Sequence, residues 1–403
     1  MVIRIMIAVI LLAILFAIAL YIDYILGRKS HLKSVRRATP SSSESNMTIF
    51  ADGPSLFTEL FAELKQAKSH IHVLFYIVKD DGIGQDFLTI LKEKASEGVE
   101  VRLLLDWAGS LPIILNKKLK KDLKSHGIEL AFANSPTFPF LFYNVQARNH
   151  RKISVIDGKF GYIGGFNVGG EYINLDPKLS PWRDYHLKLS GEGAIDLQKV
   201  FLSDWKKAAK IDLLHDVSYF PHAEKGMIKH RIIPTDAAFL EEHYSQLIKD
   251  ASQTIDIGTP YFIPGKKLLN NLLSAIGRGV KVTILIPYTS DHILVKEASY
   301  PYLRKLIQAG AEVYEYKYGF YHAKTMIVDN VAVIGTANFD KRSFFLNYEI
   351  NCYIYDESFH AQLNEIYKKD VSKATLISLQ DITGFRPIRK GKELAARSLS
   401  LFL

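Results

Sequence analysis

Two copies of one short motif bring together side chains that could do chemistry at phosphorus. Each has a histidine, a lysine two residues later and an aspartate five residues after that: His150, Lys152 and Asp157, then His322, Lys324 and Asp329. On a strand, side chains two residues apart point to the same face, so each histidine projects together with its lysine. One copy could arise by chance among 13 histidines. Two copies predict a single site built from both.

Each copy is followed by small residues and then an asparagine. These runs are Gly164-Gly165-Phe166-Asn167 and Gly335-Thr336-Ala337-Asn338. Small residues let the backbone approach a phosphate, and an asparagine amide can donate to its oxygens, so Asn167 and Asn338 are predicted to bind substrate. Six residues separate Asp157 from Gly164, but only five separate Asp329 from Gly335. We therefore expect a tighter second turn. The motif spacing thus predicts the position of Asn338 less securely than that of Asn167.

The residue types indicate cleavage of a phosphodiester. Negative charge grows on the phosphate oxygens in the transition state, and Lys152, Lys324 and the two asparagines would neutralise it. One histidine would attack phosphorus to form a phosphohistidine, while the other protonates the departing alcohol and later activates the incoming one. Each histidine is accompanied by a lysine that would repel a cation, so neither a metal nor any other cofactor is predicted.

The elements that must position these side chains occur twice. After residue 48 the pattern alternates between helical and strand periodicity, which is typical of α/β construction. The run Gly98-Val99-Glu100-Val101 is matched by Gly279-Val280-Lys281-Val282, and each half then leads to its own motif. A length of 403 residues also suits two domains. The chain is therefore predicted to be a duplicated unit whose copies face each other, with halves at 49–215 and 216–403.

The amino terminus predicts a membrane anchor over residues 1–27. The 18 residues from Ile5 to Ile22 carry no charge, and as a helix they would reach about 27 Å, close to the thickness of the bilayer's hydrocarbon core. A cleaved signal peptide is the competing interpretation, since Ala17-Ile18-Ala19 resembles a cleavage site. Against it, the apolar run continues past Ala19.

Basic residues follow the apolar run and predict topology. Only Arg4 precedes it, whereas five basic residues lie between positions 28 and 37, which places the catalytic halves on the cytoplasmic side of the cell membrane. Residues 28–48 form a polar, basic linker that is expected to be a flexible tether. The net charge of +9 favours anionic partners, either phospholipid or nucleic acid. The single cysteine, Cys352, excludes an internal disulfide.

The motifs and their surroundings resemble the phospholipase D superfamily, and within it the bacterial cardiolipin synthases. The resemblance covers nearly the whole chain after the linker. Its further blocks are Asp106-Trp107-Ala108-Gly109-Ser110, Trp182-Arg183-Asp184, Thr259-Pro260-Tyr261-Phe262-Ile263-Pro264, Asn338-Phe339-Asp340-Lys341-Arg342-Ser343, Leu346-Asn347-Tyr348-Glu349 and the ending Ala396–Leu403. It implies two similar halves, each a mixed β-sheet flanked by helices, related by a pseudo-twofold axis.

The resemblance also implies residue roles. His150 is expected to be the nucleophile and His322 the acid and base, while Glu349 and Asp184 are expected to orient the two histidines. Asp157 and Asp329 belong to the catalytic motifs, but are expected to fix the turns and the fold rather than touch substrate.

The implied activity is cardiolipin synthesis, in which a phosphatidyl group passes between two phosphatidylglycerol molecules and glycerol is released. A hydrolytic phospholipase D, a membrane-anchored phosphodiesterase or nuclease, and an inactive scaffold are the alternatives. Aromatic residues precede both motifs, at Phe138–Tyr143 and at Tyr314–Tyr321, and would suit a mouth that faces the membrane. The second group also fits an alternating buried strand. Phospholipid and membrane are thus the expected partners, and nucleic acid is not.

Overall fold

The fold is built on one continuous sheet that runs through both halves of the chain. The computed structural model describes residues 1–292, 294–383, 392–393 and 396, so most of the Ala396–Leu403 block lies outside the described residues. Fifteen strands follow the order β19-β13-β12-β10-β15-β16-β18-β9-β1-β8-β6-β5-β2-β3-β4. Read outward from the central β9-β1 pair, the two sides repeat one order of strands. The expected α/β fold with two similar halves is therefore confirmed.

The first half supplies seven strands of this sheet, with helices on both faces. Its parallel strands β2, β3 and β4 lie at one edge, and the antiparallel β5, β6, β8 and β1 lead to the centre. The elements are β1 (Ser43–Phe50), α2 (Gly53–Gln66), β2 (His70–Phe75), α3 (Gly82–Ser96), β3 (Glu100–Asp106), α4 (Leu111–Leu115), α5 (Lys117–Ser125), β4 (Glu129–Ala133), α6 (Leu141–Gln146), β5 (Ile153–Ile156), β6 (Phe160–Gly164), η1 (Gly170–Ile173), β7 (Trp182–Arg183), β8 (His186–Gly191) and α7 (Glu192–Ala209).

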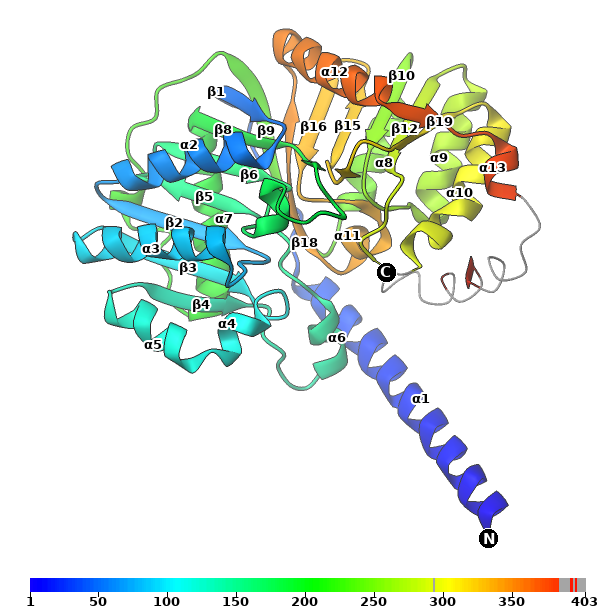
Figure 1. The fold of residues 1–403 in the computed structure, drawn as a ribbon, viewed down its shortest axis with the longest axis horizontal. Helices are drawn as coiled ribbons and strands as arrows, with labels where there is room; N and C mark the ends of the chain where they lie inside the picture. The colour runs from blue at the N-terminus through cyan, green and yellow to red at the C-terminus, as the bar shows by residue number, and fades with distance from the viewer. Residues whose placement is uncertain (293, 384–391, 394–395, 397–403) are drawn as a thin grey trace.

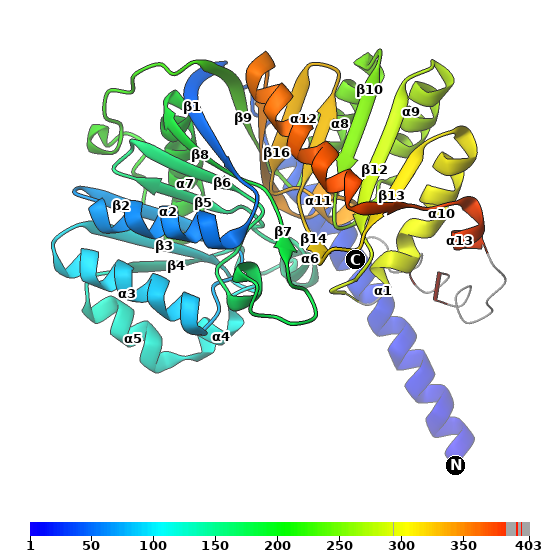
Figure 2. The same cartoon turned by 45° about the horizontal axis from the view of Figure 1, so that its top comes forward.

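The second half repeats the scheme with β10, β12 and β13 parallel and β15, β16, β18 and β9 antiparallel. Its elements are η2 (Val217–Tyr219), β9 (Ile228–Asp236), α8 (Leu240–Asp250), β10 (Thr254–Gly258), β11 (Phe262–Ile263), α9 (Gly265–Gly277), β12 (Lys281–Pro287), α10 (Val295–Ala309), β13 (Glu312–Tyr316), β14 (Phe320–Tyr321), β15 (Thr325–Val328), β16 (Val331–Gly335), β17 (Phe339–Asp340), α11 (Lys341–Phe345), β18 (Tyr348–Ile354), α12 (Glu357–Ser372), β19 (Ala374–Leu376) and α13 (Leu379–Thr383). Figures 1 and 2 show the two halves side by side.

Burial follows the strand alternation. In β2, Ile71, Val73 and Phe75 belong to a core with α2 and α3, whereas Leu74 faces the core under α7. That second core continues without a break into the other half. It joins side chains of α7 with side chains of α12, namely Leu197, Phe201, Trp205, Phe359, Leu363 and Tyr367. The halves therefore share buried apolar surface, which favours a single rigid body.

The segment 28–48 is ordered at both ends. The first helix, α1 (Val2–Ser34), runs past residue 28, and β1 begins at Ser43 and pairs with β9 at the centre of the sheet. Ser43 Oγ donates to Asp196 at 2.6 Å, and Ser45 Oγ accepts from the Gly193 amide at 2.8 Å. Ser43 and Ser45, part of the polar composition that made this segment look like a flexible tether, are in a strand, where their hydroxyls form hydrogen bonds. The expectation of a flexible tether is therefore wrong for the residues that belong to α1 and β1. The predicted bounds of the four segments stay predictions.

Helix α1 projects from the body, and its last turns pack against α6 (Figure 1). It is the one helix, among the described residues, that is long and apolar enough to cross a membrane. The Tyr143 amide donates to Asp23 at 2.9 Å, and the Tyr24 and Tyr143 rings lie 5.9 Å apart. A Cβ on Gly27 would lie 2.6 Å from that of Tyr143. This contact is too close for any residue but glycine, so the helix is fixed to the body rather than tethered to it.

Candidate active site

A cavity of about 880 Å³ opens where the two halves meet. Its lining includes both motif histidines and both predicted asparagines, His150, His322, Asn167 and Asn338. The expected convergence of the two motifs on one site is therefore present in the geometry. The histidines lie just before the hairpins β5-β6 and β15-β16, and the asparagines lie just after them.

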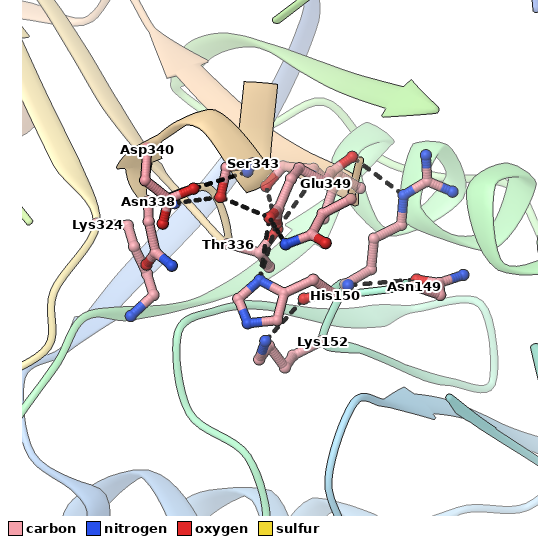
Figure 3. Close-up of polar contacts among 12 residues, drawn as sticks. Asn149, His150, Lys152, Lys324, Thr336, Asn338, Asp340, Ser343 and Glu349 are labelled. Carbon is pink, nitrogen blue, oxygen red and sulfur yellow. Dashed lines mark hydrogen bonds and ion pairs between the residues drawn. The ribbon is translucent and has the colours of Figure 1, made fainter. Parts of the chain in front are cut away.

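A short bridge between the halves positions His150. Asn149 forms an isolated parallel β-bridge with Tyr348, and the His150 amide donates to the Tyr348 carbonyl at 2.9 Å. This register places Nδ1 of His150 3.1 Å from both carboxylate oxygens of Glu349 (Figure 3). With Nδ1 occupied by the carboxylate, Nε2 is the nitrogen left for chemistry.

The second histidine is positioned in the same way with the halves exchanged. Strand β7 pairs in parallel with β14, and the His322 amide donates to the Arg183 carbonyl at 2.7 Å. Nδ1 of His322 then lies 2.6 Å from Asp184 Oδ2. Each histidine therefore receives its carboxylate from the opposite half. Both carboxylates are fully buried.

Glu349 is held by several further donors. The hydroxyls of Thr336 and Ser343 donate to it at 2.6 and 3.0 Å, and the Asn347 amide donates at 3.3 Å. Because its oxygens are fixed, the ring of His150 is fixed as well. Sequence reasoning assigned no role to these three residues. The signal was present, since Ser343 and Asn347 lie within blocks that carried the family resemblance and Thr336 lies in the small-residue run before Asn338.

The motif lysines are buried next to their histidines. Lys152 Nζ donates to the His150 carbonyl at 2.7 Å. Lys324 Nζ contacts Asp184 at 3.4 Å, lies 2.6 Å from His322 Nδ1, and also donates to the His322 carbonyl. Burial lowers the pKa of Lys152 to about 7 and lowers the pKa of Lys324 as well. An anionic phosphate in the cavity would favour the charged form of both lysines.

Burial also lowers the pKa of the histidines. For His150, the opposing charge of Glu349 offsets part of this effect. For His322, burial and then the nearby charge of Lys324 lower the pKa to about 4, against the opposing effect of Asp184. Burial acts to raise the pKa of Asp184 and Glu349, but their cationic neighbours outweigh it and leave both below the usual range. Without a ligand, both imidazoles are therefore mainly neutral beside ionised carboxylates, and an anionic phosphate nearby would raise their pKa.

The shorter spacing in the second half is confined to the turn. Three residues, 157–159, join β5 to β6, whereas two residues, 329 and 330, join β15 to β16. Beyond the turn the registers agree, because Ile153 pairs with Ile163 as Thr325 pairs with Ile334. The second turn is therefore tighter, as expected. Asn338 nevertheless occupies the same place in its half as Asn167 does in the other.

The two asparagines differ in what they contact. Asn167 Oδ1 accepts from the Ile77 amide at 3.1 Å, and its Nδ2 donates to the Tyr172 hydroxyl at 3.0 Å. Asn338 Oδ1 is buried and has no hydrogen-bond partner among the described residues. Unused hydrogen-bonding capacity in a buried side chain calls for a ligand or a water.

The motif aspartates lie at the hairpin turns and are absent from the cavity lining. Asp157 accepts from the amides of residues 68–70 at 2.7 to 3.0 Å, and Asp329 accepts from those of residues 252–254 at 2.7 to 2.9 Å. Both have positive φ, of 53° and 46°. Asp157 thus joins its turn to the start of β2, and Asp329 joins its turn to the start of β10. These contacts fit a structural role better than a catalytic one.

The aromatic segments before the two motifs have different surroundings. Phe138 is 83% exposed, and its segment continues into α6 beside α1. In the second group, Tyr316, Phe320 and Tyr321 are buried, so for these three the alternating buried strand is the correct interpretation. Among the described residues, no cluster of three or more His, Cys, Asp or Glu side chains could hold a metal ion.

Comparison with known proteins adds to this geometry. The family model "Cardiolipin synthase, PLD-like domain" matches residues 60–176 and 244–371. The minor cardiolipin synthase ClsB of Bacillus subtilis is 40% identical over 401 residues, which is 99% of this chain and 100% of that protein. A cardiolipin synthase of Oceanobacillus iheyensis is 39% identical over 339 residues, covering 83% of this chain and 70% of that protein.

Two solved structures share the fold at low sequence identity. Phosphatidylserine synthase of Haemophilus influenzae superimposes with a TM-score of 0.72 at 16% identity, over 89% of this chain and 95% of that one. Polyphosphate kinase of Porphyromonas gingivalis gives 0.56 at 14% identity, over 87% of this chain and 53% of that one.

Proposed function

This chain belongs to the family of cardiolipin synthases with PLD-like domains, and from that premise we propose that it passes a phosphatidyl group from one phosphatidylglycerol to another and releases glycerol. The observation that carries the proposal is the pair of histidines on one cavity, each held by a buried carboxylate of the opposite half. Two such histidines supply both the nucleophile and the acid that double displacement at phosphorus requires.

In the first step, Nε2 of His150 attacks the phosphorus of one phosphatidylglycerol. The bond from phosphorus to the glycerol oxygen breaks, and His322 gives its proton to that oxygen as glycerol leaves. In the second step, His322 removes the proton from a glycerol hydroxyl of the second lipid. That oxygen attacks phosphorus, the phosphorus–nitrogen bond breaks, and cardiolipin is released with both histidines restored.

The contacts of His322 support this division of roles. Its Nδ1 lies 2.6 Å from Asp184, closer than the 3.1 Å between His150 and Glu349. A shorter hydrogen bond to a carboxylate stabilises the imidazolium that an acid must form, and in His322 it opposes the lowering of the pKa by burial and by Lys324. Lys152 and Lys324 come from the two halves (Figure 3) and would neutralise the oxygens of the reacting phosphate. Asn167 and Asn338 add donors.

The anchor supports a lipid substrate over a nucleic acid. Helix α1 can cross a bilayer and is packed against the body beside α6, so the cavity stays close to the membrane surface. The excess of basic residues after the apolar run supports a cytoplasmic side for the catalytic halves.

The deciding experiment identifies products. Purified full-length protein is incubated with phosphatidylglycerol vesicles and, separately, with single-stranded DNA. Cardiolipin and glycerol in equal amounts are expected. Phosphatidic acid alone would replace the proposal with a hydrolase, and shortened DNA without a lipid product would replace it with a nuclease.

Two histidine variants test the roles. The His150→Asn variant is expected to lose activity on the order of 1000-fold or more with every lipid, because no phosphoenzyme can form. The His322→Asn variant should lose about 100- to 10,000-fold on phosphatidylglycerol. In the first turnover it should recover most of that loss on phosphatidyl-p-nitrophenol, because this leaving group needs no proton and the base is required only in the second step. Headgroup release measures both, and recovery by the His150 variant instead would exchange the roles.

A further inference from the structure

One end of the cavity, contributed by the second half, is rich in hydrogen-bond acceptors. Tyr261 follows β10 and Asp291 follows β12, and these strands are parallel neighbours, so the loops at their carboxyl ends lie together. The Tyr261 hydroxyl donates to Asp291 Oδ2 at 2.6 Å. Asn338 and Asp340 line the same cavity from the segment after β16. We call Tyr261, Asp291, Asn338 and Asp340 the acceptor end.

The acceptor end has capacity that the chain does not use. Oδ1 of Asp291 is buried without a partner, as is Oδ1 of Asn338, among the residues that the structure describes. Both side chains belong to the cavity lining, and 16% of the Asp291 side chain is exposed. Buried acceptors without donors are costly, so a ligand that brings hydroxyl hydrogens is favoured here.

On the side of the cavity that the first half contributes, one acidic side chain of the lining is already paired with a base. Lys79 and Glu171, both in the lining, form an ion pair of 2.6 Å. The two sides therefore differ in chemistry although the halves are related by duplication. A ligand that needs acceptors is directed to the second half.

The acceptor end also lies beside His322. The Tyr261 and His322 rings are 6.4 Å apart, and the charge of Asp291 acts on both His322 and Lys324. In the proposed reaction, His322 protonates the departing glycerol and deprotonates the glycerol of the incoming lipid. Both alcohols must therefore occupy the same side of phosphorus, next to these acceptors.

We propose that Asp291, positioned by Tyr261, and the amide oxygen of Asn338 bind a hydroxyl of the glycerol headgroup that takes no part in bond making or breaking, and so select a polyol as leaving and entering alcohol. This inference rests on the proposed function and names the subsite that recognises its headgroup. Tyr261 acts as a positioning residue, because its hydroxyl already donates its hydrogen to Asp291.

The test compares two lipids that differ only in headgroup hydroxyls. Full-length protein is given mixed vesicles containing equal amounts of phosphatidylglycerol and phosphatidylpropanol, and the initial rates of glycerol and propanol release are measured. The ratio of glycerol release to propanol release depends on the leaving alcohol. It can be measured whether the lipid product is cardiolipin or phosphatidic acid. A failure of the proposed transfer is therefore distinguishable from a failure of the subsite.

The wild type is expected to prefer phosphatidylglycerol on the order of 100-fold, since a site built for a hydroxyl rejects an alcohol lacking it. The Asp291→Asn variant, whose amide nitrogen faces the hydroxyl when Tyr261 holds the oxygen, should bring the ratio below about 10. The lost charge beside His322 and Lys324 changes release from both lipids alike and so cancels in the ratio. The Tyr261→Phe variant should lower the ratio by a smaller factor. The matched control is Asp86→Asn, which removes a charge from the exposed face of α3 and should leave the ratio unchanged.

Equal losses on both lipids in both variants would mean that the pair is structural, and would overturn the proposal. So would an unaltered ratio. Phosphatidylethanolamine in the same vesicles supplies a third outcome: if Asp291→Asn reduces ethanolamine release selectively, the carboxylate recognises an ammonium group and not a polyol. If Asp291→Asn does not fold, the ratio measured for Tyr261→Phe decides.

Discussion

Lys152 and Lys324 carry the positive charge of the site, and their burial makes that charge depend on pH. Both side chains are at most 3% exposed. Burial penalises the ammonium form, and the nearby carboxylates only partly offset this effect. The pKa of Lys152 is therefore about 7, so part of the population has a neutral amine at neutral pH.

The lowered pKa of Lys152 predicts that activity falls at alkaline pH, which gives the pH profile an alkaline limb. A lysine is charged below its pKa, so kcat/KM, which reports the free enzyme, should fall up to tenfold per unit as pH rises above about 7. In Lys152→Arg the rate should be lower, but this limb should move beyond pH 9, because a guanidinium keeps its proton. Short-chain phosphatidylglycerol in neutral micelles is the substrate. Lys159→Arg, an exposed change in the same hairpin, is the control. If the wild type, Lys152→Arg and Lys159→Arg all lost activity over the same pH range, the alkaline limb would not report Lys152.

At the scale of elements, very short pairings do most of the positioning. The two-residue strands β7 and β14, and the single bridge between Asn149 and Tyr348, align each histidine with a carboxylate of the other half. The hairpins supply the lysines and asparagines. Helix α6 has a different task, because it joins the segment before His150 to the anchor helix α1.

The loop before α6 is expected to touch lipid. Phe138 is 83% exposed and lies three residues before α6, which packs against α1. Phe140 and Phe142 instead pack against the cluster that includes Tyr24 and Tyr143. A single Phe138→Ser change therefore removes the exposed ring without disturbing the anchor. It should lower activity on vesicles about tenfold, because a buried aromatic side chain contributes roughly 1.5–3 kcal/mol. Activity on a soluble short-chain lipid should hardly change.

The control for this prediction is Met227→Ser, which removes an equally exposed apolar side chain, 86% exposed, from the loop between α7 and β9. It should affect neither assay. Equal losses on vesicles and soluble substrate after Phe138→Ser would contradict the membrane contact.

At the scale of the whole molecule, the two halves behave as one folding unit. One sheet and one apolar core run through both. Buried polar contacts add to this, since Asp370 of α12 accepts from Arg183 at 2.8 Å and from the Tyr185 hydroxyl at 2.6 Å. Arg151 joins Asp204 and Asp236 across the same boundary, each at 2.5 Å.

Unfolding should therefore be a single transition for both halves. All three tryptophans, Trp107, Trp182 and Trp205, lie in the first half, so fluorescence reports that half while circular dichroism reports both. Asp370→Asn should lower stability by about 3 kcal/mol, because it leaves Arg183 without its buried carboxylate. The fluorescence and dichroism curves should shift together. Asp122→Asn, in a half-exposed pair with Lys92, should cost at most about 1 kcal/mol. Separate transitions by the two probes would show independent halves.

The sequence by itself determined the features that depend on short spacings. Strand alternation placed each histidine with its lysine, the repeated order of elements predicted two similar halves, and the uncharged run predicted α1. Only the tertiary structure decided which carboxylate serves which histidine, because His150 lies 199 residues from Glu349 and His322 lies 138 residues from Asp184. The tertiary structure likewise decided that β1 pairs with β9 at the centre of the sheet and that Asp291 lines the cavity. These depend on contacts between distant strands, which no local pattern records.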